Sequence, residues 1–233
     1  LEYCIREDLK LKRPRLMAVL DPVKLIIDNY PEGQTEMLTV GNNPENEALG
    51  SREVPFGRER YIEREDFMEE PPKKYFRMFP GNEVRLMNAY FVKCTGCVKN
   101  QAGEVVEVHC TYDPASRGGN SPDGRKVKGT IHWVAADTAL KAEVRLYENI
   151  IDEEKGVYNE DGSLNLNPNS LTVLKDCKLE PAFAGAEKYA RFQFVRQGFF
   201  CVDARDSGPD ALVFNRIVSL KSSFVLPKSD AAQ

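Results

Sequence analysis

The stretch RKVKGTIHWV spans residues 125–134 and holds three basic residues, one of the two histidines and the only tryptophan. If it is a strand, its successive side chains lie on opposite faces. One face is apolar and carries Val127, Ile131 and Trp133. The other face is polar and cationic, and it consists of Lys126, Lys128, Thr130 and His132. We expect the apolar face, with Trp133, to lie in a core; the pattern leaves open whether the cationic face is only solvated or contacts phosphates.

Similar short segments extend in both directions from this stretch. β-Branched and aromatic residues dominate EVRLMNAYFVK (83–93), EVVEVHCTYD (104–113), ARFQFVRQGFFCVD (190–203) and LVFNRIVSL (212–220). Turn residues of the Asp-Gly and Pro-Gly type separate such segments, which is typical of barrels and sandwiches. Strands and helices do not alternate, so a nucleotide-binding βαβ fold is not indicated. Residues 1–13 differ, because Leu1, Ile5 and Leu9 form one helical stripe.

The composition limits the class of protein. Lys plus Arg is 32 and Asp plus Glu is 36, a formal net charge of -4. This excludes a simple polycation that coats nucleic acid, but it leaves room for a local basic groove. No apolar run reaches the ~18–20 residues that a membrane-spanning helix needs. Six cysteines in 233 residues are ordinary for a reduced protein and few for a disulfide scaffold, so we expect a cytoplasmic protein.

The charges are unevenly distributed along the chain. Residues 71–99 carry six basic residues against Glu83 alone, a net charge of +5, whereas residues 59–70 contain six acidic residues. This asymmetry fits a binding groove beside an acidic wall, and it equally fits a solvated surface. Taken alone, the solvated surface is the simpler interpretation.

One group of residues has the composition of a metal site. Cys94-Thr95-Gly96-Cys97 is followed by His109-Cys110, and two such pairs could hold zinc. However, strand alternation puts Cys94 and Cys97 on opposite faces unless a bulge intervenes, and adjacent His and Cys side chains also point apart. We therefore predict no metal site, and no redox role for a CxxC pair that lacks a βαβ context.

Several stretches together resemble one known family. They occur in the family's order over almost the whole chain, and they are LEYCIREDL, PRLMAVLDPVKL, GSREVPF, GNEVRLMNAY, CTYD, DGRKVKGTIHWV, EVRLY, FQFVRQGFFCVD and VFNRIVSL. The family is the C-terminal anticodon-binding region of the glutaminyl-tRNA synthetases. Glutamyl-tRNA synthetases of the archaeal and eukaryotic type share the IHWV-like strand, and GFFCVD followed by VFNRIVSL favours the glutaminyl form.

The resemblance implies an all-β fold of two ribosomal-protein-L25-like β-barrels in tandem, preceded by the end of a connector helix. The implied parts are residues 1–13 for the helix, 14–115 and 124–228 for the two barrels, and 229–233 for a polar tail, with strands interleaved between the barrels. The family's catalytic half binds ATP and magnesium, but its HIGH-type and KMSK-type motifs are absent from this sequence. The resemblance therefore implies no catalytic residue, no cofactor and no metal in this chain.

The resemblance also implies which residues read the anticodon of tRNA-Gln. Arg15, Gln193 and Arg196 match the residues around the central uridine, and Arg77 matches the arginine at the third-position guanine. Arg85 lies where the family has an arginine near the first base. A regular strand would put Gln193 and Arg196 on opposite faces, so their convergence requires a bend.

Further positions are implied less directly. The candidate phosphate contacts are Lys73, Lys74, Lys126 and Lys128. Met87 stands where the bacterial pattern EVRLRNAY has an arginine, and Phe76 stands where a lysine is common; Phe76 could stack on a base, although an aromatic residue in a strand is more often core. The implied partner is the anticodon loop of tRNA-Gln, bound by a monomer, with no DNA and no membrane. Without the resemblance, Arg15, Arg77 and Arg85 are interpreted as surface or barrel-junction ion pairs. The alternative functions are the anticodon-binding region of an archaeal or eukaryotic-type glutamyl-tRNA synthetase and a non-catalytic β-barrel protein-interaction module.

Overall fold

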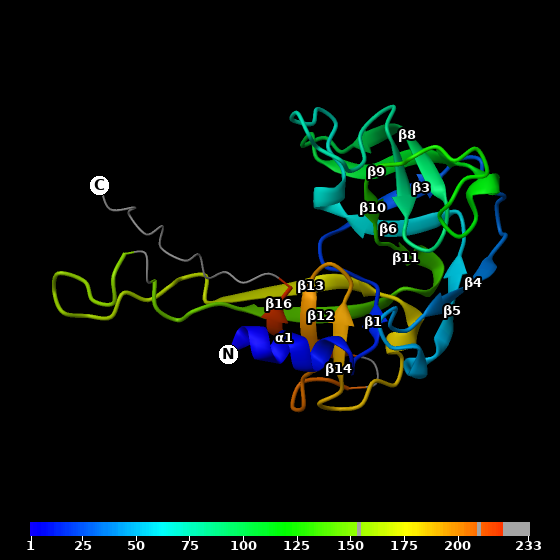
Figure 1. Ribbon diagram of the computed structural model, residues 1–233. Helices are drawn as coiled ribbons and strands as arrows, with labels where there is room; N and C mark the ends of the chain where they lie inside the picture. Colours follow the sequence, from blue (N-terminus) through cyan, green and yellow to red (C-terminus); the bar gives the residue numbers. More distant parts are fainter. Residues whose placement is uncertain (153–154, 209–210, 221–233) are drawn as a thin grey trace, which may run out of the picture.

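The computed structural model describes residues 1–152, 155–208 and 211–220. The predicted tail and the preceding residues 221–228 lie outside the described residues. Figure 1 shows two strand-rich bodies, with helix α1 (Glu2–Lys10) against the lower one, and the predicted all-β fold with one helix is confirmed. In the part of the chain that the structure describes, no helix is long and apolar enough to cross a membrane.

The first sheet forms the upper body in Figure 1, in the order β10-β7-β8-β9-β3-β6-β11. Its strands are β3 (Pro22–Ile27), β6 (Glu59–Glu63), β7 (Glu83–Leu86), β8 (Phe91–Lys99), β9 (Val105–Tyr112), β10 (Thr130–Ile131) and β11 (Val134–Ala135). Only His132 and Trp133 separate the two end strands, so the sheet curls into a barrel. A two-stranded sheet of β4 (Glu36–Gly41) and β5 (Ser51–Phe56) covers it, and Phe56 packs edge-on against Trp133 in the shared core.

The second sheet has the order β1-β14-β15-β16-β12-β13-β2. Its strands are β1 (Arg15–Leu16), β2 (Ala18–Val19), β12 (Leu140–Tyr147), β13 (Leu171–Leu179), β14 (Arg191–Phe194), β15 (Gly198–Val202) and β16 (Leu212–Ser219). Met17 alone separates the end strands, so this sheet also closes into a barrel. Its core is built on phenylalanines, among them Phe183, Phe194 and Phe214. Short 3₁₀ helices span Glu47–Leu49, Arg64–Asp66 (η2), Pro114–Ser116, Ala136–Thr138 and Pro181–Phe183.

The two barrels share the segment that contains β1 and β2. Leu16, Ala18 and Leu20 point into the second core, whereas Met17 and Val19 point into the first. A strand covered on both faces is expected to be apolar at every position, which accounts for the unbroken run LMAVL. The segment therefore packs into the hydrophobic cores of both barrels and connects them.

The segment that contains β10 and β11 also connects the two barrels, because it comes shortly before the strands of the second barrel but pairs with the first. β10 and β11 fall inside the expected second-barrel range 124–228, yet they pair with β7 and β6 of the first barrel. The division between 115 and 124 therefore does not coincide with the division between the sheets.

The opening stretch is a strand over only part of its length. Gly129 has a φ of +90°, and a Cβ on it would lie 1.8 Å from the carbonyl oxygen of Phe76, so the chain turns there and the regular alternation is lost. Placing His132 on a polar outer face is wrong: its side chain is fully buried, because the stretch passes between the barrels. The predicted burial of Trp133 is confirmed, and its Nε1 donates to the carbonyl oxygen of Met87 at 3.0 Å.

Candidate nucleic-acid interface

Arg15 and Gln193 lie side by side at an edge of the second sheet. β1 and β14 run parallel, and their register pairs Arg15 with Gln193. The two backbone amides donate to the carbonyl oxygens of Asn42, at 2.6 Å, and Pro14, at 3.0 Å. Both side chains line a cavity of about 270 Å³, here called the edge cavity. The structure thus brings together two of the three residues that the resemblance assigns to the central uridine.

The edge cavity is charged and contains unpaired polar atoms. Arg15 Nη2 lies 2.5 Å from Glu45 Oε1, and Lys10 Nζ lies 2.8 Å from Glu45 Oε2. Hydrogen bonds from Lys10 and Arg15 hold the pKa of Glu45 below its usual value. Among the described residues, Arg15 Nε and Gln193 Oε1 are buried without a hydrogen-bond partner. Buried polar groups that lack partners cost free energy, which a polar ligand in the cavity would recover.

Arg77 and Arg196 meet on Asp66, the last residue of η2. Arg196 Nη1 and Nη2 donate to the two oxygens of Asp66 at 2.6 and 2.7 Å. Arg77 Nε lies 3.3 Å from Asp66 Oδ1, and its Nη1 lies 3.0 Å from Glu65 Oε1. The structure therefore groups Arg196 with an arginine of the first barrel, and not with the two residues of the edge cavity.

The turn between β14 and β15 directs Arg196 toward the first barrel. Its φ of +66° lies in the left-handed region, which residues other than glycine seldom occupy. On either side, Val195 N donates to the carbonyl oxygen of Leu16 and Gln197 N donates to that of Phe194, both at 3.0 Å. The expected bend is present, but it carries Arg196 onto Asp66.

His132 supports Arg196 from the other side. Its Nε2 lies 2.9 Å from the carbonyl oxygen of Ala18, and its Nδ1 lies 3.3 Å from Arg196 Nη1. Its Nε2 also lies 3.4 Å from Glu63 Oε1, so the imidazole sits between Arg196 and Glu63.

Glu63 is a second buried carboxylate at this junction. It accepts hydrogen bonds from the backbone amides of Leu20 and Asp21, at 2.8 and 3.0 Å, and from Gln197 Nε2 at 2.8 Å. Burial by itself would raise the pKa of Glu63, but hydrogen bonds from His132 and from the two amides outweigh it and lower the pKa. We call Glu63, Asp66, His132 and Arg196, together with Arg77, the barrel junction.

Arg85 stands apart from the edge cavity and the barrel junction. Its Cζ lies 5.2 Å from the centre of the Phe91 ring, and Arg125 lies at 5.1 Å from the same ring. A Cβ on Gly119 would lie 3.0 Å from Arg85 Cδ, so the loop that follows β9 packs closely against this arginine. The contacts described for Arg85 therefore include no side chain of the edge cavity or the barrel junction.

The four candidate lysines are exposed, and the two loops that carry them adjoin. Lys128 Nζ lies 5.3 Å from the centre of the Phe76 ring, and the backbones of Phe76 and Gly129 are in contact. Phe76 is 52% exposed, so its interpretation as a core residue is wrong; it lies in a loop and not in a strand. An exposed aromatic ring beside lysines can stack on a base while the lysines contact phosphates.

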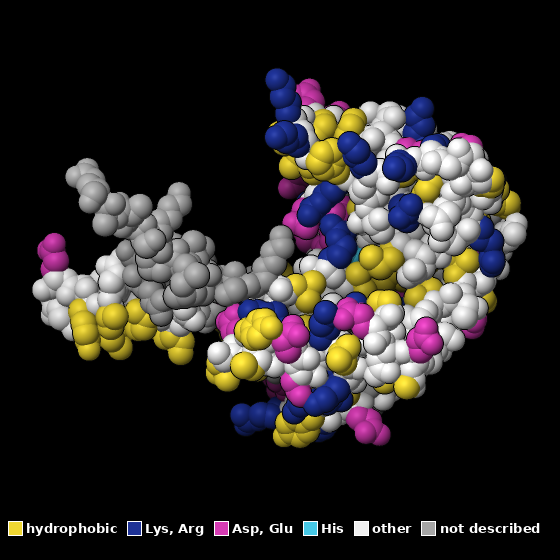
Figure 2. All heavy atoms as spheres, viewed as in Figure 1, with side chains coloured by type: hydrophobic (Ala, Val, Ile, Leu, Met, Phe, Trp, Pro, Cys, Tyr) yellow, Lys and Arg dark blue, Asp and Glu magenta, His cyan; other side chains and the backbone are white. Residues whose placement is uncertain are grey.

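The acidic segment 59–70 supplies ion-pair partners to the basic segment 71–99. Arg77 pairs with Glu65, and Lys99 pairs with Glu69. Figure 2 shows a hollow between the two bodies, with both basic and acidic side chains along the wall formed by the upper one.

The cysteines of β8 and β9 belong to the first barrel. Cys94 faces Cys110 across the two strands, and a bulge after Cys94 lets Cys97 also pack against the core, contrary to strict alternation. Burial raises the pKa of Cys94 to about 11. His109 Nδ1 lies 2.9 Å from Asp28 Oδ1. Within residues 1–152, 155–208 and 211–220, no three potential metal ligands gather.

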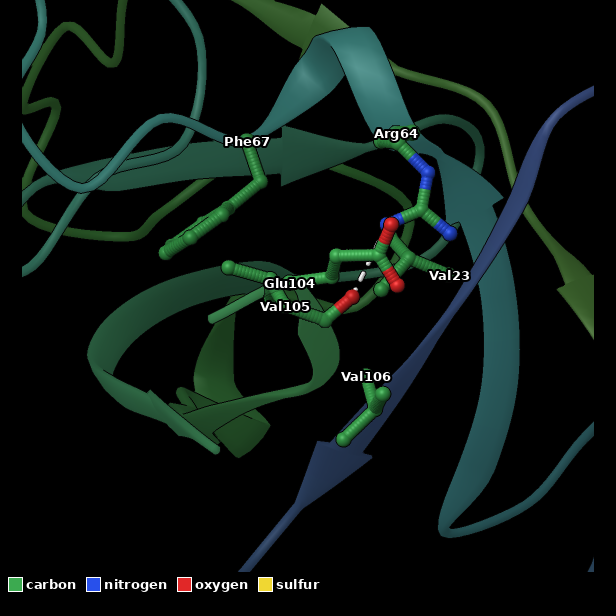
Figure 3. A pocket seen from close by; sticks show the side chains of 6 residues that line it. All are labelled: Val23, Arg64, Phe67, Glu104, Val105 and Val106. Carbon is green, nitrogen blue, oxygen red and sulfur yellow. Dashed lines mark hydrogen bonds between the residues drawn. The ribbon is translucent and has the colours of Figure 1, made fainter. Parts of the chain in front are cut away.

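A separate cavity of about 410 Å³ opens on the first barrel (Figure 3). Its wall is mostly apolar, and Arg64 Nη1 donates to the carbonyl oxygen of Val105 at 2.8 Å beside it. None of the residues assigned from the sequence lines this cavity, so we leave it outside the candidate interface.

Four residues of the edge cavity and the barrel junction discussed above were not assigned from the sequence, namely Glu45, Glu63, Asp66 and His132. Asp66 belongs to the acidic run already noted, which is the only local signal for it. Its partner Arg196 lies 130 positions away, and no local pattern reports such a contact. Glu45 carries no signal of its own.

Comparison with known proteins places the sequence in a family. Residues 14–113 and 130–203 each match a family described as tRNA synthetases class I (E and Q), anti-codon binding domain. The chain therefore belongs to the anticodon-binding domains of the class I tRNA synthetases for glutamate and glutamine. Within that family it is similar to enzymes of the glutamine type.

Three relatives illustrate this similarity. The chain is 55% identical over 231 residues to a glutamine–tRNA ligase of Clostridium kluyveri, and 55% identical over 230 residues to one of Clostridium perfringens. It is 51% identical over 224 residues to a glutamine–tRNA ligase of Bradyrhizobium diazoefficiens. The alignments cover 98%, 97% and 96% of this chain and 41%, 41% and 40% of the relatives. The chain thus spans about two fifths of the length of these curated relatives.

Proposed function

We propose that this chain recognises the anticodon loop of tRNA-Gln for a glutamine–tRNA ligase. In this proposal the reaction, which joins glutamine to tRNA-Gln with ATP and magnesium, takes place on residues beyond the 233 of this chain. The chain contributes binding and base selection, acts as a monomer in the cytoplasm, and binds neither DNA nor a membrane.

The edge cavity is the observation that carries this proposal. Uracil presents two carbonyl acceptors on either side of one N–H donor. Arg15 supplies donors and Gln193 Oε1 is an unpaired acceptor in the same cavity wall, which is the complementary set. Proteins read RNA sequence mainly on bases that have left the stack, through hydrogen bonds to their edges. A central uridine turned out of the anticodon loop would satisfy both unpaired atoms.

The barrel junction would read a second base. Guanine presents O6 and N7 as two acceptors, which an arginine fork can contact together. The Arg77 side chain is 37% exposed, and its ion pairs with Glu65 and Asp66 hold it in one conformation. It can therefore donate to a base with little loss of side-chain entropy. The exposed lysines Lys73, Lys74, Lys126 and Lys128 would neutralise phosphates without selecting a base.

The test is binding of the chain to tRNA-Gln and to the same tRNA with its central uridine changed to cytidine, at two salt concentrations. We expect the base change to cost about 1–3 kcal/mol at both concentrations. Equal and strongly salt-dependent binding of the two tRNAs would reduce the interface to an electrostatic surface. Preference for tRNA-Glu over tRNA-Gln would favour the glutamyl type of domain, and no binding to either would contradict the proposal.

A further inference from the structure

The barrel junction physically links two residues that the family resemblance assigns to different bases. Arg77 is assigned to the third-position guanine and Arg196 to the central uridine, and both contact the buried carboxylate of Asp66. We propose that Asp66 is a positioning residue that holds the two arginines as one unit, so that the chain reads the two bases jointly and not independently. This inference rests on the proposed function.

Asp66 holds Arg77 through the backbone as well as through its side chain. Met78 N donates to the carbonyl oxygen of Asp66 at 2.9 Å, and Met68 N donates to that of Met78 at 3.0 Å. Arg77 Nη1 also donates to the carbonyl oxygen of Glu65 at 3.2 Å. Residues 65–68 are thus tied by hydrogen bonds to the loop that carries Arg77.

Arg196 reaches Asp66 from the second barrel and keeps donors for a ligand. A guanidinium has five N–H groups. Asp66 accepts from two of them and His132 Nδ1 lies within reach of a third, which leaves two for a base. The constrained turn at Arg196, with its positive φ, is retained by surroundings that fix it, as is common at functional sites.

The coupling arises because one oxygen serves both arginines. Asp66 Oδ1 accepts from Arg196 Nη2 at 2.7 Å and lies 3.3 Å from Arg77 Nε. A base that pulls one guanidinium away strengthens or reorients the contact that the other makes with the same atom. Residues in one hydrogen-bond and ion-pair network characteristically show non-additive energies.

The experiment measures how the full 233-residue chain discriminates between tRNA-Gln transcripts. One transcript carries the normal anticodon, one has the central uridine changed to cytidine, and one has the third guanine changed to adenine. Wild-type chain should prefer the normal anticodon roughly 10-fold or more at each base. Asp66→Asn, which keeps the shape but turns an acceptor into a donor facing the arginines, should lower discrimination at both bases by roughly 3-fold or more.

Arg77→Lys provides a second arm that does not depend on the stability of the Asp66 variant. Joint reading requires that Arg77→Lys lowers discrimination at the central uridine as well as at the guanine. The control is Glu180→Gln, which alters another buried carboxylate between the barrels, paired with Arg52; it should leave guanine discrimination unchanged.

The outcomes separate this inference from the proposed function. If wild-type chain discriminates both bases but Arg77→Lys affects the guanine alone, the joint reading is overturned and anticodon recognition stands. The joint reading is also overturned if Asp66→Asn folds, by circular dichroism and thermal melting, and discriminates like wild type. If wild-type chain does not discriminate at all, the proposed function fails and the joint reading fails with it.

Discussion

The edge cavity and the barrel junction place the same kinds of side chain in opposite states. In the edge cavity, Arg15 and Gln193 border open space, and each has a buried polar atom without a described partner. At the barrel junction, Arg196 and Asp66 are joined by two short charge-assisted hydrogen bonds, and His132 and Glu63 complete the network. The edge cavity contains buried polar atoms without described partners, whereas the two arginines of the barrel junction are already held by Asp66 before any ligand arrives.

This difference corresponds to two ways in which a free protein can favour RNA binding. An unpaired polar atom lowers the stability of the free protein and favours whatever supplies its partner. A saturated ion pair fixes a side chain in advance, so less conformational entropy is lost on binding. In the proposed function, the edge cavity would offer unpaired atoms to the central uridine, and the barrel junction would present arginines that are already held in place. The following substitutions test that division.

The largest expected effect is on stability, at the barrel junction. Asp66→Ala would leave two arginines without the carboxylate on which they converge. Losing one partner of a buried ion pair typically costs about 3–5 kcal/mol, and because Arg196 and Arg77 remain 26% and 37% exposed, we expect about 2–3 kcal/mol in urea unfolding at pH 7. The matched variant in the edge cavity is Glu45→Ala, which should cost less than about 1 kcal/mol because Glu45 is 39% exposed. Equal losses would erase the distinction between the regions.

The sequence anticipated the two regions to different degrees. The apolar run LMAVL and the aromatic content of FQFVRQGFF are typical of strands, and together with the family resemblance they pointed to Arg15 and Gln193. Alternation indicates which residues share a face, but it does not indicate which distant strand pairs with them. The contact between Asp66 and Arg196 depends on the crossing of β1, β2, β10 and β11 between the barrels, so it became visible only in three dimensions. His132 was misplaced for the same reason, since a covered strand has no outer face.

The next effect concerns acid stability and compares two buried carboxylates between the barrels. The pKa of Glu63 is below its usual value of 4.5, so its contribution is present above pH 4.5 and is lost as the pH falls through its folded-state pKa. Glu63→Gln should cost about 2 kcal/mol at pH 7, through its mismatched hydrogen bonds. That difference from wild type should shrink below pH 4.5 in urea titrations.

Glu180 provides the opposite case. Its Oε1 lies 2.5 Å from Arg52 Nε, yet burial outweighs this pairing and raises the pKa of Glu180. Wild type should therefore gain stability relative to Glu180→Gln as the pH falls from the folded-state pKa toward 4.5. Parallel pH profiles for the two variants would show that the environments of the carboxylates do not differ as described.

A smaller effect separates binding from stability within the edge cavity. Gln193→Leu removes an acceptor that has no described partner in the free chain, so stability should stay within about 0.5 kcal/mol of wild type. Binding of tRNA-Gln should weaken by about 1–2 kcal/mol, with a reduced preference for the central uridine. The control is Gln197→Leu, four positions along the same hairpin. In wild type, Gln197 Nε2 donates to Glu63 Oε1 at 2.8 Å. Gln197→Leu should lose about 1 kcal/mol of stability and keep the uridine preference. If Gln197→Leu lost the uridine preference and Gln193→Leu kept it, the edge cavity would not be the site that reads the uridine.

The smallest expected effect lies outside both regions, at the exposed lysines. Lys128 is held over the Phe76 ring by a cation–π contact and not by an acidic partner in the described residues, so its charge is available to a phosphate. Lys128→Ala should weaken binding of normal and altered tRNA-Gln equally, by less than about 1 kcal/mol, and should reduce the slope of log K against log salt by about 1. Lys141→Ala is the matched control, because Lys141 is also exposed, on the second barrel, but pairs with Asp176 at 2.8 Å, and it should leave the slope unchanged. A loss of base preference in Lys128→Ala would mean that this lysine contacts a base edge, which would extend base reading beyond the edge cavity and the barrel junction.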